Sequence, residues 1–197
     1  MINKLYRIFL LAYTKCYTFI THSVNIGEGS VVYPTTRISN SCMERVKIGA
    51  NCAIGRRKKG PIIGHFFPTR IIIKGSDASV HIGNNTNLNG VYIASRKSIE
   101  IGSNCRIAAG VVILDHNGHI VNSGDRTHGQ DIPNPITIGD NVWLGTNCII
   151  LKGTVIGDNS VVSCGSVVKG VFEENSIIQG NPAKVVGKVQ IDKTKIS

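Results

Sequence analysis

The chain has 197 residues, enough for one domain with a real core, and its 42% apolar content excludes extended disorder. Aromatic residues make up only 6%, which favours β-structure built from small aliphatic layers. The net charge of +10 suits an anionic partner, but no nucleic-acid-binding motif accompanies it, so we expect no nucleic-acid partner. The six cysteines form no C-x-x-C pair, and we interpret them as free thiols in a reducing compartment, the cytoplasm.

The first predicted element is an amphipathic helix over residues 1–22. Apolar residues recur there at helical spacing, and the segment carries Lys4, Arg7 and Lys15 without any acidic residue. Its apolar run is too interrupted to cross a bilayer, and no small-residue cleavage site follows that would indicate a signal peptide. Two interpretations stay open. The preferred one is a helix packed on its own protein, and the other is a peripheral helix on the inner face of an anionic membrane.

From residue 23 to residue 190 the chain is dominated by an aliphatic residue at every sixth position. The longest run is Ile138, Leu144, Ile150, Ile156, Val162 and Val168. A six-residue step fits neither an α-helix nor a hairpin meander, but it fits a parallel β-helix in which each short strand turns one aliphatic side chain inward. Gly, Asn and Asp in "IGDN" supply tight turns. Cys52, Cys105 and Cys148 each lie four residues after a leading aliphatic, so we predict that they are small structural residues.

The repeat stops over residues 114–135 and resumes at Ile136. The interruption gathers His116, His119 and His128 in one polar segment, "ILDHNGHIVNSGDRTHGQDIPNP". A regular β-helix offers flat faces and no pocket. The segment therefore predicts a loop that protrudes from the β-helix.

Several motifs together resemble the left-handed β-helix acyltransferases. They are "DHNGH", "DR", "PITIGDNVWLGTNCIILKGTVIGDNSVV" and "QGNPAKVVGKV". They are most similar to the galactoside/maltose O-acetyltransferase branch and to its relatives that acetylate bacterial surface polysaccharides. The resemblance spans roughly residues 25–189. It implies an all-β fold, with a short N-terminal helix, a left-handed parallel β-helix over residues 23–190, a protruding catalytic loop over 114–135 and a C-terminal tail over 191–197.

The resemblance also implies a biochemical function. It predicts a homotrimer with active sites between subunits, acetyl-CoA as co-substrate, and a hydroxyl of a sugar or oligosaccharide as acceptor. No metal is expected. An N-acetyltransferase acting on an amino-sugar is the nearest alternative. A zinc enzyme of the γ-carbonic anhydrase kind and a non-catalytic β-helix scaffold are alternatives from other classes.

A hydroxyl nucleophile needs a general base, and the pKa of histidine suits that role near neutral pH. Family members commonly carry an acidic residue four places before the catalytic histidine. Asp115 and His119 have that spacing, so the resemblance makes His119 the predicted base and Asp115 its orienting group. Other members carry "DHDH", and this chain has one more residue between its histidines, which keeps His116 as the alternative. His128 is predicted to be a solvated bystander.

Binding residues are assigned by the same resemblance. The backbone N–H of Thr146, just after the "VWLG" tract, is the predicted donor to the oxyanion. The residues expected along the donor are Cys164, Ser166, Lys169, Lys184 and Lys188. Asn87 or Asn89 is expected to contact the acceptor. Trp143 is expected either to line the cleft or to be a core or trimer-interface aromatic, and Arg126 either to contact the acceptor or to hold the loop in an ion pair with Asp125.

Overall fold

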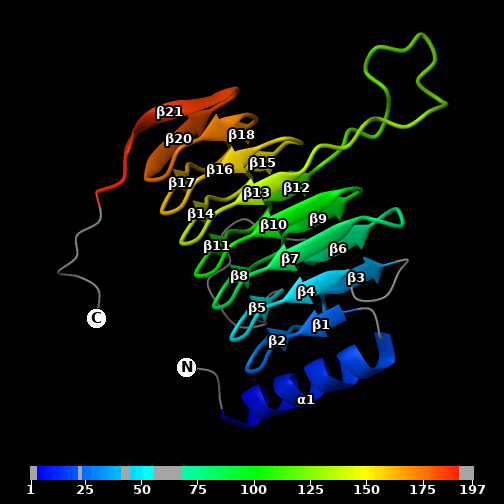
Figure 1. The fold of residues 1–197 in the computed structure, drawn as a ribbon. Helices are drawn as coiled ribbons and strands as arrows, with labels where there is room; N and C mark the ends of the chain where they lie inside the picture. The colour runs from blue at the N-terminus through cyan, green and yellow to red at the C-terminus, as the bar shows by residue number, and fades with distance from the viewer. Residues whose placement is uncertain (1–3, 22–23, 41–44, 56–67, 191–197) are drawn as a thin grey trace.

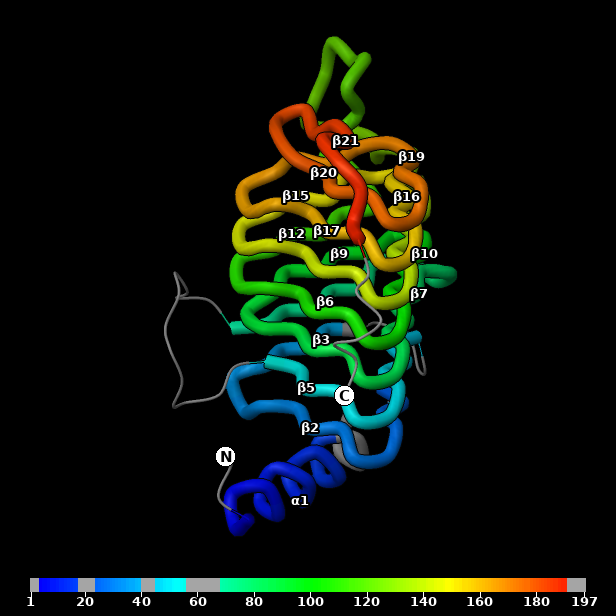
Figure 2. The backbone as a smooth tube through the Cα atoms, turned by 90° about the vertical axis from the view of Figure 1, so that its left-hand side faces the viewer, coloured from blue at the N-terminus to red at the C-terminus, as the bar shows by residue number. Residues whose placement is uncertain are grey.

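The computed structural model describes residues 4–21, 24–40, 45–55 and 68–190. One helix, α1 (Lys4–Thr21), is followed in these residues by short strands wound into stacked coils. Figure 2 shows the coils edge on, rising from β2 near α1 to β20 at the opposite end. The predicted tail over residues 191–197 lies outside the described residues.

Successive strands fall on three different faces, so each coil is triangular. The first sheet consists of β1 (Val24–Ile26), β4 (Val46–Ile48), β7 (Ser79–Ile82), β10 (Ser98–Ile101), β13 (Ile136–Ile138), β16 (Val155–Ile156) and β19 (Val171–Phe172). The second consists of β2 (Val31–Val32), β5 (Ala53–Ile54), β8 (Asn87–Leu88), β11 (Arg106–Ile107), β14 (Trp143–Leu144), β17 (Val161–Val162), β20 (Ser176–Gly180) and β21 (Ala183–Lys188). The third consists of β3 (Arg37–Asn40), β6 (Arg70–Ile73), β9 (Tyr92–Ser95), β12 (Val112–Leu114), β15 (Ile149–Ile150) and β18 (Val167–Val168).

Neighbouring strands within each sheet come from adjacent coils and pair in parallel. The exception among the described strands is the last hairpin, in which β21 folds back antiparallel on β20 at the end of the stack. The parallel β-helix predicted from the six-residue step is therefore confirmed.

The core is the column of leading aliphatics. Ile138, Leu144, Ile150 and Ile156 are at most 1% exposed, as the repeat predicts. Val162 and Val168 continue the same column to the last coils. Each coil buries its aliphatics against the next, so stability comes from stacking.

The three cysteines predicted to be structural are also in the core. Cys52, Cys105 and Cys148 are at most 1% exposed. Burial raises the pKa of all three thiols, which keeps them neutral and unreactive.

The turns explain the Gly and Asn of the repeat. A Cβ added at Gly102 would lie 2.5–2.6 Å from the backbone of Gly139 in the next coil, so only glycine permits this spacing. Asn104 and Asn141 adopt left-handed conformations, with φ of 60° and 54°, which asparagine tolerates better than most residues.

Helix α1 lies across the open end of the first coil (Figure 1). Leu10 is fully buried against Val31 and Tyr33. The Thr14 hydroxyl accepts a hydrogen bond from the Val32 N–H at 2.9 Å, which ties the helix to β2. The helix thus packs on its own protein, and it is not apolar enough along its length to span a membrane.

Candidate active site

The repeat breaks between β12 and β13, where the chain leaves the coil in a long excursion (Figure 1). Its two arms stay together at the point of departure, which we call the neck. There the Asn134 N–H donates to the Asp115 carbonyl at 2.8 Å, and the Gly153 N–H donates to the Asn134 carbonyl. The neck is therefore anchored to the β-helix on both sides.

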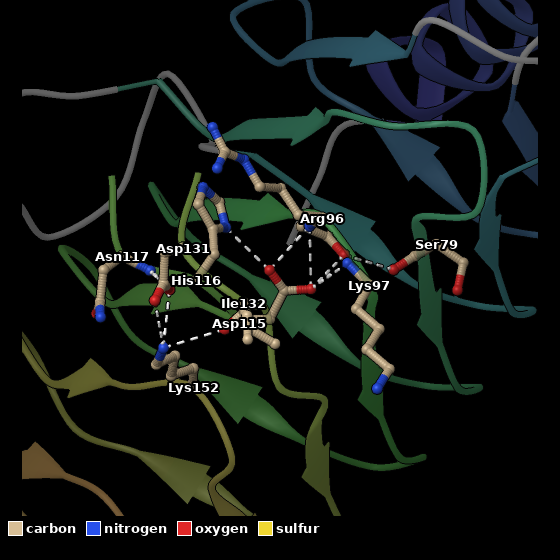
Figure 3. Close-up of polar contacts among 10 residues, drawn as sticks. Ser79, Arg96, Lys97, Asp115, His116, Asn117, Asp131, Ile132 and Lys152 are labelled. Atoms are coloured by element: carbon tan, nitrogen blue, oxygen red, sulfur yellow. Dashed lines mark hydrogen bonds and ion pairs between the residues drawn. The ribbon is translucent and has the colours of Figure 1, made fainter. Parts of the chain in front are cut away.

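Asp115 is the buried centre of the neck, with no exposed surface. Its Oδ2 accepts hydrogen bonds from the Ser95 hydroxyl at 2.8 Å and from the Lys97 N–H at 2.7 Å. Its Oδ1 accepts the Arg96 N–H at 2.8 Å and lies 2.9 Å from Nδ1 of His116 (Figure 3). The carboxylate is thus held rigidly by the preceding coil.

This contact decides how the His116 ring is used. Because a carboxylate oxygen only accepts, Nδ1 of His116 carries a proton, and in the neutral ring the lone pair is then on Nε2. The side chain of His116 is only 11% exposed. The imidazole therefore has the orientation and the tautomer that a general base requires.

A second carboxylate closes the neck. Asp131, on the returning arm, accepts the Asn117 N–H at 2.7 Å and forms an ion pair with Nζ of Lys152 at 2.7 and 2.8 Å. Lys152 also donates to the Ile132 carbonyl at 3.1 Å. The Lys152 ammonium and the Asn117 N–H hold the pKa of Asp131 below its ordinary value. We call Asn117, Asp131 and Lys152 the neck latch, because together they join both arms of the loop to the turn between β15 and β16 (Figure 3).

The outer loop holds the other two histidines. His119 is exposed, and no hydrogen bond or ion pair of its side chain occurs among the described residues. His128 is 86% exposed, with Nδ1 2.6 Å from Asp125 Oδ2. Hydrogen bonds from Thr127 and His128 hold the pKa of the exposed Asp125 carboxyl at about 2. The same contacts link residues 125–128 in a local turn. Arg126 is exposed in the same turn.

Apart from Arg126 in the outer loop, the residues predicted to contact the acyl group or the acceptor lie on or next to the second sheet of the same chain. Trp143, 52% exposed, is in β14 of the second sheet, whereas His116 follows β12 of the third. Asn87 is in β8 of the second sheet, where its Oδ1 accepts the Ala53 N–H, and Asn89 follows that strand and is exposed. Thr146 lies at the turn after β14, and its N–H makes no hydrogen bond within the described residues. One chain alone does not bring these groups to His116.

The residues predicted along the donor lie on the last coils. Cys164 and Lys169 are exposed there, and Lys184 and Lys188 are exposed on β21. Ser166 is 1% exposed, and its hydroxyl donates to the Ser163 carbonyl at 2.7 Å and accepts the Gly180 N–H. The Ser166 side chain therefore serves the turn rather than the surface.

The sequence analysis did not identify Ser95, which holds Asp115, or the latch pair Asp131 and Lys152. None of these three residues belongs to a recognisable motif. The β-helix register was the available signal for Ser95, because it places residue 95 one coil before residue 115. No cluster of three or more His, Cys, Asp or Glu side chains that could hold a metal occurs among the described residues.

Two family models match the repeats. The bacterial transferase hexapeptide (six repeats) matches residues 135–170, and the hexapeptide repeat of succinyl-transferase matches residues 79–115.

Named relatives are similar over the same region. The chain is 41% identical over 106 residues to an Escherichia coli K12 protein named as a lipopolysaccharide biosynthesis O-acetyl transferase, WbbJ, covering 50% of this chain and 54% of the relative. It is 37% identical over 113 residues to galactoside O-acetyltransferase of the same organism, covering 57% and 55%. The matches thus span about half the length of these curated relatives.

A solved structure extends the similarity to most of the chain. Galactoside acetyltransferase in complex with coenzyme A superposes with a TM-score of 0.62 at 27% identity, covering 90% of this chain and 72% of the other. The coils, the family models and these relatives agree. The chain is built on hexapeptide repeats wound into a left-handed β-helix, and it is similar to the hexapeptide-repeat acetyltransferases, galactoside O-acetyltransferase among them.

Proposed function

We propose that the protein transfers an acetyl group from acetyl-CoA to a hydroxyl of a sugar or of a bacterial surface-polysaccharide precursor. The observation that carries this proposal is the His116–Asp115 pair at the neck of the loop. Names of similar proteins support the chemistry: two are named as O-acetyltransferases, and the galactoside acetyltransferase structure holds coenzyme A.

In this mechanism Nε2 of His116 takes the proton of the acceptor hydroxyl as its oxygen attacks the thioester carbonyl. The C–S bond then breaks, and the proton passes from His116 to the departing CoA thiolate. Asp115 holds Nδ1–H and stabilises the imidazolium that forms in between. The resemblance pointed first to His119. The buried carboxylate contact favours His116 instead, because His119 has no group in the described residues to orient it.

The free N–H of Thr146 suits the developing oxyanion, but it lies on a different face from His116 of the same chain. A homotrimer with sites between neighbouring β-helices would bring the two groups together. Exposed apolar side chains on the flanks, Trp143 at 52% and Val171 at 76%, support such contacts. His116→Ala and Trp143→Ala are each expected to lose activity, and where both variants sediment as trimers, mixing them should restore partial activity in mixed trimers. No restoration would contradict a shared site.

The outward face of α1 supports a peripheral membrane contact at the inner face of the cell membrane. Ile8 and Phe9 are 56% and 55% exposed, and the exposed cations Lys4 and Arg7 are nearby on a helix without acids. Cosedimentation with vesicles rich in phosphatidylglycerol should exceed that with neutral vesicles and fall in the Ile8→Ser/Phe9→Ser variant. Equal sedimentation with both vesicle types would contradict the contact.

The direct test of the function is to incubate the full chain with acetyl-CoA and a panel of oligosaccharides. Thiol release and a product heavier by one acetyl group are the expected results, with hydroxyl acceptors preferred over amino-sugar acceptors. The His116→Ala variant is the matched inactive control. Thiol release only with amines would favour the N-acetyltransferase. Turnover of bicarbonate that depends on stoichiometric zinc would favour the hydratase, and no turnover of any kind would favour the scaffold.

A further inference from the structure

Arg96 occupies the position next to His116 on the preceding coil. Strands β9 and β12 pair in register, with Ile93 opposite Ile113 and Ala94 opposite Leu114. Continuing that register by two residues sets Arg96 opposite His116. Equivalent positions on adjacent coils face the same side, about 4.8 Å apart. In Figure 3 the Arg96 guanidinium accordingly lies beside the His116 imidazole.

The guanidinium of Arg96 forms no hydrogen bond or ion pair with a side chain of the described residues. Its Nη1 is buried without a hydrogen-bond partner, and no described acid forms an ion pair with it. A buried charged donor without a hydrogen-bond partner is destabilising, so such a group calls for an explanation. The side chain as a whole is partly exposed, although Nη1 itself is buried.

The neighbouring carboxylate does not neutralise Arg96. Asp115 receives the backbone N–H of Arg96, but its oxygens are also occupied by Ser95, Lys97 and His116. Lys74 lies in the same column, because its N–H donates to the Ser95 carbonyl one coil further along. The surface next to His116 therefore carries uncompensated positive charge.

We propose that Arg96 binds an oxyanion of the acceptor, a carboxylate or a phosphate, so that the enzyme acts on an acidic sugar. This inference rests on the proposed function and names its substrate class. A guanidinium pairs with either oxyanion through two parallel N–H donors. Because Arg96 and His116 occupy equivalent positions on adjacent coils, an anionic group held by Arg96 would lie near the hydroxyl that gives up its proton, as it does within a single acidic sugar residue.

Direct binding tests the site without catalysis. Ligand-observed NMR would compare glucuronate, glucose 1-phosphate and glucose with the wild-type chain, Arg96→Gln and Lys47→Gln. Lys47 is an exposed cation on β4, outside the neck, and serves as the matched control. We expect one or both anions to bind more tightly than glucose, with at least tenfold weakening in Arg96→Gln and little change in Lys47→Gln. The two anionic ligands distinguish a carboxylate acceptor from a phosphorylated one.

Turnover provides the second readout. The ratio of kcat/KM for a uronate-containing oligosaccharide to that for its neutral counterpart should fall about tenfold or more in Arg96→Gln, with Arg96→Lys intermediate. Binding of neither anion, or equal binding to Arg96→Gln and to wild type, would overturn the anion site. Intact anion binding without acetyl transfer to any acceptor would instead refute the proposed function and leave the anion site standing.

Discussion

Replacing Asp115 with asparagine tests how the base is prepared. An asparagine side chain has only one acceptor oxygen, whereas the two oxygens of Asp115 meet separate sets of donors. Ser95 and Lys97 donate at Oδ2, and Arg96 and His116 meet Oδ1. The amide oxygen satisfies more donors at the Oδ2 position, so the NH₂ group would turn toward His116. Nδ1 would then have to accept, and the ring proton would move to Nε2, where the lone pair is needed.

The size of the effect follows from this change of partner. A hydrogen bond to a charged group contributes about 1.5–3 kcal/mol. Removing it from the active tautomer and giving a neutral bond to the inactive one shifts the balance by about 2–4 kcal/mol, or roughly 30- to 1,000-fold in rate. The Arg96 N–H also reaches Oδ2, at 3.0 Å, so the fold should lose only about 1 kcal/mol.

The assay measures thiol release from acetyl-CoA at saturating acceptor, together with urea unfolding of the same samples. Asp115→Asn should lower kcat by the factor above, with a nearly unchanged urea midpoint. The double variant Asp115→Asn/His116→Ala should be no less active than His116→Ala alone, because both changes act on the same base. A folded Asp115→Asn variant with kcat within threefold of wild type would refute the reasoning.

Three further predictions concern the neck latch and the core. Lys152→Met removes the ion pair to Asp131 and should lower kcat/KM about fivefold, whereas Lys47→Met, at an exposed lysine on β4, should not; equal effects would contradict a latch. The pKa of Asp131 is lowered, so its bond to Asn117 is complete above about pH 4 and is lost as pH falls through that lowered value. The Asn117 amide shift should therefore titrate below pH 4 in NMR spectra, and a higher midpoint would contradict this. Leu144→Ala, at a fully buried position, should lower the free energy of unfolding by about 2–5 kcal/mol in urea, and a loss below 1 kcal/mol would contradict tight stacking.

The six-residue repeat predicted the fold because each leading aliphatic residue marks a position whose side chain is buried in the core of the β-helix. Each coil must bury one aliphatic side chain per strand. This requirement explains both why Ile150 and Ile156 are buried and why such residues recur every six positions. The interruption after Leu114 was equally visible as a break in that period.

The arrangement of the site was less accessible to sequence. Spacing alone paired Asp115 with His119, whereas the structure pairs it with His116, because the donors of the preceding coil fix the carboxylate before the chain leaves the neck. The contact between Asp115 and His116 depends on the residue at which the loop leaves the coil, and the six-residue repeat does not specify that residue. Arg96 was overlooked for a related reason, since its position beside His116 exists only through the register of β9 and β12.

The most direct test of the account compares His116→Ala with His119→Ala in acetyl transfer from acetyl-CoA to a sugar hydroxyl. Both changes remove one imidazole from the same loop, so they are matched in chemistry and differ in their contact with Asp115. The account predicts that His116→Ala loses about 10²–10⁴-fold in kcat, while His119→Ala stays within about threefold of wild type. The reverse outcome, an active His116→Ala and an inactive His119→Ala, would contradict it.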